Sequence, residues 1–281
     1  MTNTRLFTLI TLITLLPLRL IAAIDMQAHV GSDEGKKAYT TYATKQNAYY
    51  TNDYAYTTLI SLTNDALFGR LNTLMETTCK HKKGSGYDYD DLRYEYVNVD
   101  RDLNNPGQII LYYNGATHTG VWDAGKTWNR EHTWPDSKGN KSSDSNDIMM
   151  LRPTSISENS SRGNTAYGKS SSYYNPNSES GGKYDLRGDV ARIFLYVYVR
   201  WGNTSKMWGS DGVMESLDVL LKWMEEDPVD TWEMGRNDSV ESITGTRNVF
   251  VDYPELAYYL FDKAVPANMP TPSGKGSENA Y

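Results

Sequence analysis

A carboxylate and a histidine stand next to each other in the middle of the chain, at Glu131 and His132, and an amide and a guanidinium follow at Asn159 and Arg162. Histidine can take a proton from water near neutral pH, because its ordinary pKa lies in that range. A carboxylate and an amide offer oxygen ligands of the kind that Mg²⁺ prefers, while a guanidinium can neutralise a phosphate. These residue types together indicate hydrolysis of a phosphodiester bond.

The neighbouring positions of Glu131 and His132 impose a condition on the backbone. Successive side chains of a regular strand point to opposite faces of the sheet. Both side chains can therefore face a single site only if the strand bends or bulges, as strands often do beside active sites. We expect such a distortion at this point of the chain.

Residues 154–164 predict a helix that carries the other two side chains. Thr154 or Ser155 is suited to its N-cap, because a short hydroxyl side chain can accept a hydrogen bond from a free backbone N–H. Asn159 and Arg162 are three residues apart and so share one helix face. From that face both can reach a single phosphate.

The rest of the chain is mainly helical in pattern. Apolar residues recur every three or four positions over residues 59–71, 190–201 and 214–224, which is typical of helices with a buried face. Short apolar runs at residues 108–113 and 148–151 are typical of buried strands. The expected fold class is α+β, a mainly helical single domain around a small central sheet.

The ends of the chain differ in composition from its middle. Residues 1–23 combine a basic residue, a short apolar run and small residues, as a secretory signal peptide does. The run is shorter than the roughly 20 residues of a membrane span, so we expect secretion, or a periplasmic location in a Gram-negative bacterium, without stable membrane association after processing. The predicted organisation continues with a flexible lead-in at 24–47, a domain at 48–262 and a disordered tail at 263–281.

The charge is acidic overall and unevenly distributed. The formal net charge is −7, which disfavours a general nucleic-acid-binding surface because phosphate contacts come from Lys and Arg. Residues 126–204, which include the residues suited to catalysis, hold 11 Lys and Arg against 8 Asp and Glu. The single cysteine, Cys79, excludes an intrachain disulfide and a cysteine-ligated zinc site.

Three segments of the sequence resemble the endonuclease I family of secreted nucleases, which have a ββα-metal (His-Me finger) core. They are residues 129–135, 147–153 and 159–164, which read NREHTWP, DIMMLRP and NSSRGN. Similar flanking stretches extend the resemblance over about residues 48–261. The segments share their order and spacing with the family pattern, which makes the resemblance specific.

The resemblance implies a role for each residue. His132 would be the general base, and Glu131 and Asn159 would bind one Mg²⁺, with Mn²⁺ or Ca²⁺ as alternative ions. The family typically cuts DNA, and often RNA, with little sequence preference, and leaves 5′-phosphate and 3′-hydroxyl ends. The expected partner is therefore nucleic acid, contacted through its backbone, and we expect the protein to be a monomer.

The residue that contacts the phosphate is open among several candidates. Longer family members place an arginine in an insertion that this chain lacks. Arg162 is the favoured replacement because of its helix spacing from Asn159. Arg130, Arg152 and Asn164 are the further candidates for binding substrate.

One departure from the family pattern keeps other functions open. The pattern has a histidine where this chain has Met149, so polar support for His132 could be missing. The alternative is then a catalytically impaired relative that binds nucleic acid. Acidic charge and abundant tyrosine and tryptophan also fit an extracellular adhesion or glycan-binding module, in which Glu131 and His132 would be dispensable.

Overall fold

The computed structural model describes residues 48–80, 89–102, 107–139, 144–176, 185–267 and 269. The predicted signal peptide, the predicted lead-in and the last part of the predicted tail lie outside these residues. Within the predicted tail, Met269 is buried in the main hydrophobic cluster, so the chain is still packed on the domain at that position. No described helix combines the length and the apolar character that crossing a bilayer requires.

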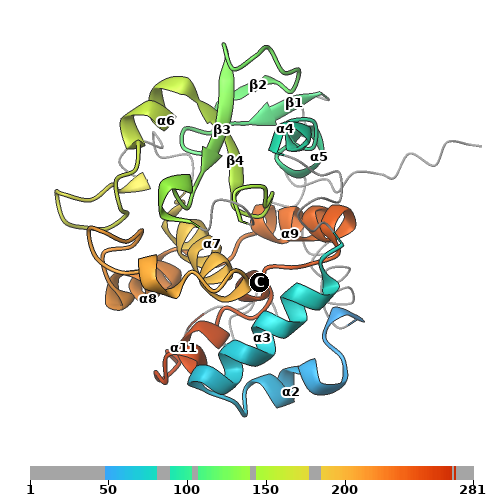
Figure 1. The fold of residues 1–281 in the computed structure, drawn as a ribbon, viewed down its shortest axis with the longest axis vertical. Helices are drawn as coiled ribbons and strands as arrows, with labels where there is room; N and C mark the ends of the chain where they lie inside the picture. Colours follow the sequence, from blue (N-terminus) through green and yellow to red (C-terminus); the bar gives the residue numbers. More distant parts are fainter. Residues whose placement is uncertain are drawn as a thin grey trace, which may run out of the picture.

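Four short strands form two separate antiparallel sheets at one end of the described structure (Figure 1). β1 (Gln108–Ile110) pairs with β2 (Thr117–Thr119), and β3 (Trp128–His132) pairs with β4 (Leu151–Ser155). The helix α6 (Ile156–Arg162) follows β4 directly and contacts both strands of the second sheet. The α+β class is confirmed, but the prediction of one central sheet is wrong, since the described residues form two.

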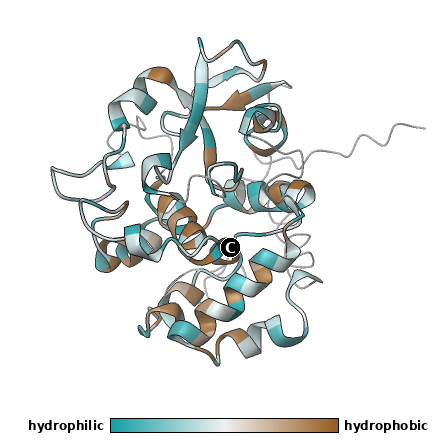
Figure 2. Ribbon diagram, in the orientation of Figure 1, coloured by the Kyte–Doolittle hydropathy of each residue, from teal (hydrophilic) through white to brown (hydrophobic). Residues whose placement is uncertain are grey.

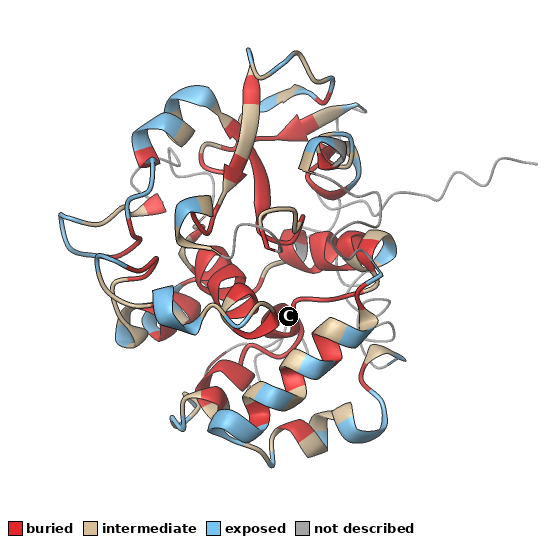
Figure 3. Cartoon of the chain, viewed as in Figure 1, coloured by how far each residue is buried: buried red, intermediate tan, exposed pale blue. Residues whose placement is uncertain are grey.

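The helix α7 (Arg187–Arg200) is the centre of the helical part (Figures 1 and 3). It packs against α3 (Asn64–Thr78), α8 (Leu217–Glu226) and α10 (Val249–Asp252), and nearly all of its residues are buried. Its apolar residues are not confined to one stripe, and such a helix is stable only where neighbours cover it on several sides (Figure 2). The other described helices are α2 (Tyr56–Leu59), α4 (Tyr89–Leu92), α5 (Tyr96–Val99), α9 (Thr231–Thr244) and α11 (Leu256–Leu260), with 3₁₀ turns at Asn52–Tyr54, Asp136–Lys138 and Thr204–Lys206.

One predicted strand is wrong, and a buried arginine explains the difference. Residues 148–150 form a turn, and only Leu151 of the predicted run belongs to β4. Arg236 of α9 donates to the carbonyl oxygen of Ile148 at 2.7 Å and to that of Met149 at 3.1 Å. Because these carbonyl groups are satisfied by a side chain, the turn can be buried without a partner strand.

A buried ion network joins α7 to α9 and to the end of α8. Arg192 of α7 donates to Glu233 Oε1 at 2.8 Å and to the carbonyl oxygen of Asp227 at 2.9 Å, and lies 3.4 Å from the carboxylate of Asp189. All four residues are buried. Burial raises the pKa of Asp227 from its ordinary value of 3.8 to about 8, although Arg192 opposes the shift. Between about pH 4 and pH 8 the folded protein therefore holds a proton on Asp227 that the unfolded chain releases.

The free energy of unfolding of the Asp227→Asn variant is expected to depend less on pH than that of the wild type. Because the pKa of Asp227 is raised on folding, the free energy of unfolding of the wild type falls as the pH rises from about 4 to about 8. The variant lacks this titration, so its loss between pH 5 and pH 8 should be smaller by about 1.4 kcal/mol or more, the equivalent of one pKa unit. Urea denaturation at both pH values measures the difference.

The exposed carboxylate of Asp211 provides the control for this experiment. Asp211→Asn should retain the pH dependence of the wild type, because it removes an exposed carboxylate and leaves Asp227 in place. Equal pH slopes for Asp227→Asn and the wild type would contradict the prediction.

Candidate active site

The residues suited to catalysis lie on the β3–β4–α6 unit. β3 pairs with β4 in regular antiparallel register, with Glu131 opposite Arg152 and His132 opposite Leu151. The predicted bend or bulge at this point is therefore wrong. As the regular strand requires, the two side chains leave opposite faces: Glu131 is fully buried, while His132 is partly exposed.

The start of α6 is fixed by the second of the two predicted N-cap residues. Ser155 Oγ accepts a hydrogen bond from the backbone N–H of Glu158 at 3.3 Å and donates to Glu158 Oε2 at 2.7 Å. The first of these bonds is an N-cap interaction, which stabilises the first turn of a helix. It sets the rotation of α6, so that Asn159 and Arg162 both face β3, as their spacing predicts.

Asn159 faces β3 with its amide nitrogen. Its Nδ2 donates to Asn129 Oδ1 at 2.8 Å and to the carbonyl oxygen of Arg130 at 3.3 Å. With the nitrogen held in this way, the orientation of the amide is determined. Asn159 is partly exposed, and its amide oxygen, which makes neither of these two bonds, can serve as a ligand.

One oxygen of the Glu131 carboxylate receives nearly all of the polar contacts. Glu131 Oε1 accepts hydrogen bonds from Arg162 Nε at 2.7 Å and Tyr113 Oη at 2.7 Å, a longer one from Tyr167 Oη at 3.4 Å, and another from Arg162 Nη2. The other oxygen, Oε2, is buried without a hydrogen-bond partner. Burial raises the pKa of the Glu131 carboxyl above its ordinary value, although Arg162 and Tyr113 lower it.

His132 is held by the backbone and by an aromatic ring. Its Nε2 lies 3.0 Å from the carbonyl oxygen of Ser145, and its ring stacks on Tyr89 with centroids 5.2 Å apart and an interplanar angle of 15°. Because a carbonyl oxygen only accepts, we assign the proton to Nε2 and the lone pair to Nδ1. Burial lowers the pKa of His132. The imidazole is therefore suited to act as a neutral base near pH 7.

The position of Met149 answers the question raised by the sequence. Met149 is buried in the main hydrophobic cluster, and the polar support of His132 comes instead from the carbonyl group of Ser145. A backbone carbonyl can orient a histidine as a side chain does. The missing histidine therefore does not leave His132 without a hydrogen-bond partner.

Two of the predicted phosphate contacts need correction because their guanidinium groups are buried. Arg152 is 2% exposed and pairs with Asp100 at 2.8 Å and with Asp189 at 3.4 Å. Arg162 is also 2% exposed, and besides Glu131 it donates to the carbonyl oxygen of His132. Both guanidinium groups bond internal carboxylate or carbonyl groups and are not available to a nucleic acid in this conformation.

Two further candidates remain closer to solvent. Arg130 is partly buried and donates to Asp90 Oδ1 at 3.2 Å, and its guanidinium carbon lies 3.5 Å from the centroid of the Tyr89 ring. Since Tyr89 also stacks on His132, Arg130 and His132 share the same face of β3. Asn164 is exposed in the segment that follows α6. Their predicted role in binding substrate stays a prediction.

Sequence reasoning missed the tyrosines that surround this site. Tyr113 and Tyr167 bond Glu131 from positions 18 and 36 residues away, and Tyr89 reaches His132 across a similar gap in the chain. The spacing of residues along the sequence does not predict contacts over such separations. The one available signal is the 22 tyrosines in the chain, because buried tyrosine hydroxyls usually need a hydrogen-bond partner.

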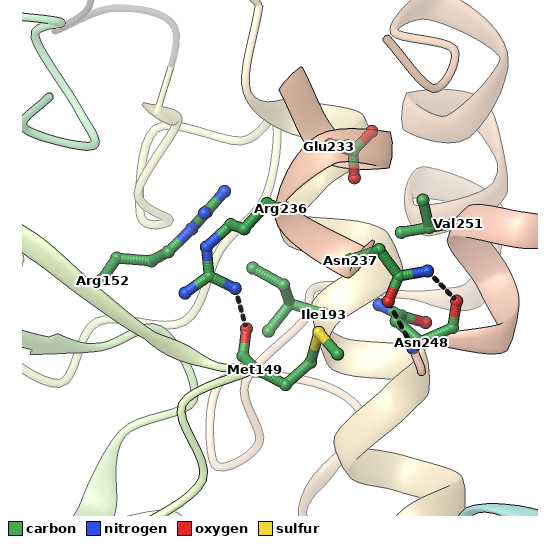
Figure 4. A pocket seen from close by; sticks show the side chains of 8 residues that line it. All are labelled: Met149, Arg152, Ile193, Glu233, Arg236, Asn237, Asn248 and Val251. Atoms are coloured by element: carbon green, nitrogen blue, oxygen red, sulfur yellow. Dashed lines mark hydrogen bonds between the residues drawn. The ribbon is translucent and has the colours of Figure 1, made fainter. Parts of the chain in front are cut away.

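A small cavity lies beside the turn that precedes β4 (Figure 4). Its water-accessible volume is about 20 Å³, which is room for one water molecule. Its walls are formed by Met149, Arg152, Ile193, Glu233, Arg236, Asn237, Asn248 and Val251. Because Glu131, His132 and Asn159 do not line it, this cavity belongs to the internal packing and not to the candidate site.

The sequence is similar to known nucleases. The sequence profile of the family described as Endonuclease I matches residues 20–255, which include β3, β4 and α6. Two relatives are extracellular ribonucleases, from Bacillus amyloliquefaciens (36% identical over 184 residues) and Bacillus subtilis strain 168 (32% identical over 192 residues). The alignments cover 57% and 60% of this chain, and 63% and 67% of the relatives, so the chain spans about two thirds of their length.

Arg162→Met is expected to lower the free energy of unfolding by roughly 3–5 kcal/mol, because it leaves the buried Glu131 carboxylate without its ion-pair partner. Urea denaturation measures the loss. In the double variant Glu131→Gln/Arg162→Met part of the stability should return, since no charge is then left buried and unpaired. If Arg162→Met lowers the free energy of unfolding by less than about 1 kcal/mol, which is the usual contribution of an exposed ion pair, the Glu131–Arg162 pair does not stabilise the fold as predicted.

Proposed function

Because this chain belongs to the endonuclease I family, we propose that it is a secreted, metal-dependent endonuclease that hydrolyses phosphodiester bonds of nucleic acid with little sequence preference. The observation that carries this proposal is the β3–β4–α6 unit, which would be the ββα-metal core. This one unit supplies a histidine with a free ring nitrogen, a buried carboxylate oxygen without a partner and an oriented amide.

His132 would be the general base. The carbonyl group of Ser145 holds Nε2, so the lone pair of Nδ1 is available to take a proton from an attacking water. Stacking on Tyr89 keeps the ring from rotating about its side-chain bonds. The lowered pKa keeps the imidazole neutral, and thus competent as a base, at neutral pH.

Glu131 and Asn159 would hold a single divalent ion. Among the described residues there is no cluster of three or more His, Cys, Asp or Glu side chains suited to a metal. One carboxylate oxygen and one amide oxygen suffice for Mg²⁺, however, because this ion usually keeps several of its waters. When bound, the ion supplies positive charge that stabilises the phosphate and the leaving oxygen. The unpartnered, buried Glu131 Oε2 is the atom that fits this role best.

The substrate would be contacted mainly through its backbone. Arg130 and Asn164 are the proposed contacts, and neither implies recognition of a base. The names of the two relatives support RNA as a substrate and an extracellular location, and the resemblance of the sequence motifs supports DNA as well. We therefore propose that both polymers are cut.

Replacing His132 by alanine is expected to reduce cleavage by roughly 10²–10⁴-fold, the usual contribution of a positioned general base. Purified mature protein would be incubated with a 5′-labelled RNA and with supercoiled plasmid, and product ends would be analysed for 5′-phosphate. The control is His118→Ala, since His118 lies on β2, in the other sheet. Equal rates for His132→Ala and the wild type would refute the assignment of the base.

Chelation by EDTA should also abolish cleavage, and added Mg²⁺ should restore it. Cleavage that persists in EDTA would refute the dependence on a metal. If the protein retains nucleic acid in a binding assay but cuts neither polymer with any divalent ion, it is the impaired relative. If it neither binds nor cuts nucleic acid, the adhesion or glycan-binding alternative gains support.

A further inference from the structure

The two oxygens of the Glu131 carboxylate differ sharply in their surroundings. Oε1 accepts two hydrogen bonds from Arg162 and one from Tyr113, and Tyr167 lies 3.4 Å away. A carboxylate oxygen has about two lone pairs, so Oε1 has no remaining capacity for a further ligand. Oε2 is buried and has no hydrogen-bond partner. Any ligand that binds this carboxylate must therefore use Oε2 alone.

The groups on Oε1 form a rigid clamp, which consists of Arg162, Tyr113 and Tyr167. The hydroxyl groups of the two tyrosines also bond each other. Since Tyr113 donates to Glu131, it can accept from Tyr167, which gives a chain of hydroxyl groups that ends on Oε1. Both tyrosines are fully buried, so neither can rotate away without disturbing the core.

Packing fixes the clamp from behind. The ring of Tyr174 meets both tyrosine rings at centroid distances of 5.4 Å, and Phe194 of α7 meets the Tyr167 ring at 5.2 Å. These edge-to-face contacts keep the hydroxyl groups directed at Glu131. The carboxylate therefore cannot easily turn to present both oxygens to one ion.

We propose that the clamp makes the site selective for Mg²⁺ over Ca²⁺ by restricting Glu131 to one oxygen; this inference rests on the proposed metal site. Ca²⁺ takes six to eight oxygen ligands and often binds a carboxylate through both oxygens. Mg²⁺ requires six ligands in near-ideal octahedral geometry and readily uses one carboxylate oxygen with several waters. A carboxylate with only Oε2 available suits the smaller ion and denies the larger one the second carboxylate oxygen that it often uses.

The test removes the hydroxyl groups and measures ion binding without nucleic acid. Isothermal titration calorimetry of the mature protein would give the Kd for Mg²⁺ and for Ca²⁺ separately. In Tyr113→Phe/Tyr167→Phe the carboxylate is held by Arg162 alone and can turn more easily, so the preference for Mg²⁺ should fall about tenfold, at the lower end of the usual effect of residues that support metal ligands. Tyr174→Phe is the matched control, because its described contacts with the clamp are ring to ring, and its ion preference should equal that of the wild type.

Glu131→Gln separates failure of this inference from failure of the proposed site. If Glu131→Gln weakens ion binding while the double tyrosine variant keeps the preference of the wild type, selection by the clamp is refuted and the metal site stands. If Glu131→Gln binds both ions as the wild type does, the proposed metal site is refuted together with the inference. Circular dichroism would verify folding; if the double variant does not fold, Tyr113→Phe alone decides in the same way.

Discussion

The buried ion pair between Glu131 and Arg162 is the interaction on which the candidate site depends. It links the end of β3 to the last turn of α6, and the same guanidinium also bonds the carbonyl group of His132. Isolated charges of this kind would be very unfavourable in the interior. They are tolerated here because each is met by the other, and because the carboxylate also accepts a hydrogen bond from the Tyr113 hydroxyl. The position of α6 relative to β3, and with it the distance from Asn159 to the strand, follows from this pair.

A second set of arginines holds the scaffold behind the site. Arg236 satisfies the carbonyl groups of the turn before β4 and pairs with Asp100, which also pairs with Arg152. Arg152 in turn lies 3.4 Å from Asp189 of α7. The chain of ion pairs thus runs from the helical part of the protein to β4, the strand that pairs with β3. In this part of the described structure an acidic protein uses buried arginines for internal structure, so these guanidinium groups are not available to bind phosphate.

The sequence predicts the helix and strands that carry the site residues better than it predicts the side chains that surround those residues. The helix that carries Asn159 and its serine cap follow from local chemistry, which the neighbouring residues determine. The tyrosines on Glu131 come from segments far away in the chain, and only the folded structure brings them together. The burial of Arg152 could not be predicted either. An arginine in a strand can face solvent or the interior, and its carboxylate partners, Asp100 and Asp189, lie far away in the sequence.

The wrong expectation of a bulge shows why adjacent residues suit this chemistry. A regular strand sends Glu131 into the interior, where its charge and geometry can be controlled, and sends His132 toward the face that Tyr89 and Arg130 share. The carboxylate needs burial to be held by fixed donors, whereas a base needs access to water. The alternation of the strand gives each of these consecutive residues its own surroundings; in the proposed site a phosphate would have to lie at the end of β3, where His132 is the last strand residue, to reach both. A bulge that turned both side chains to one face would have exposed the carboxylate or buried the base.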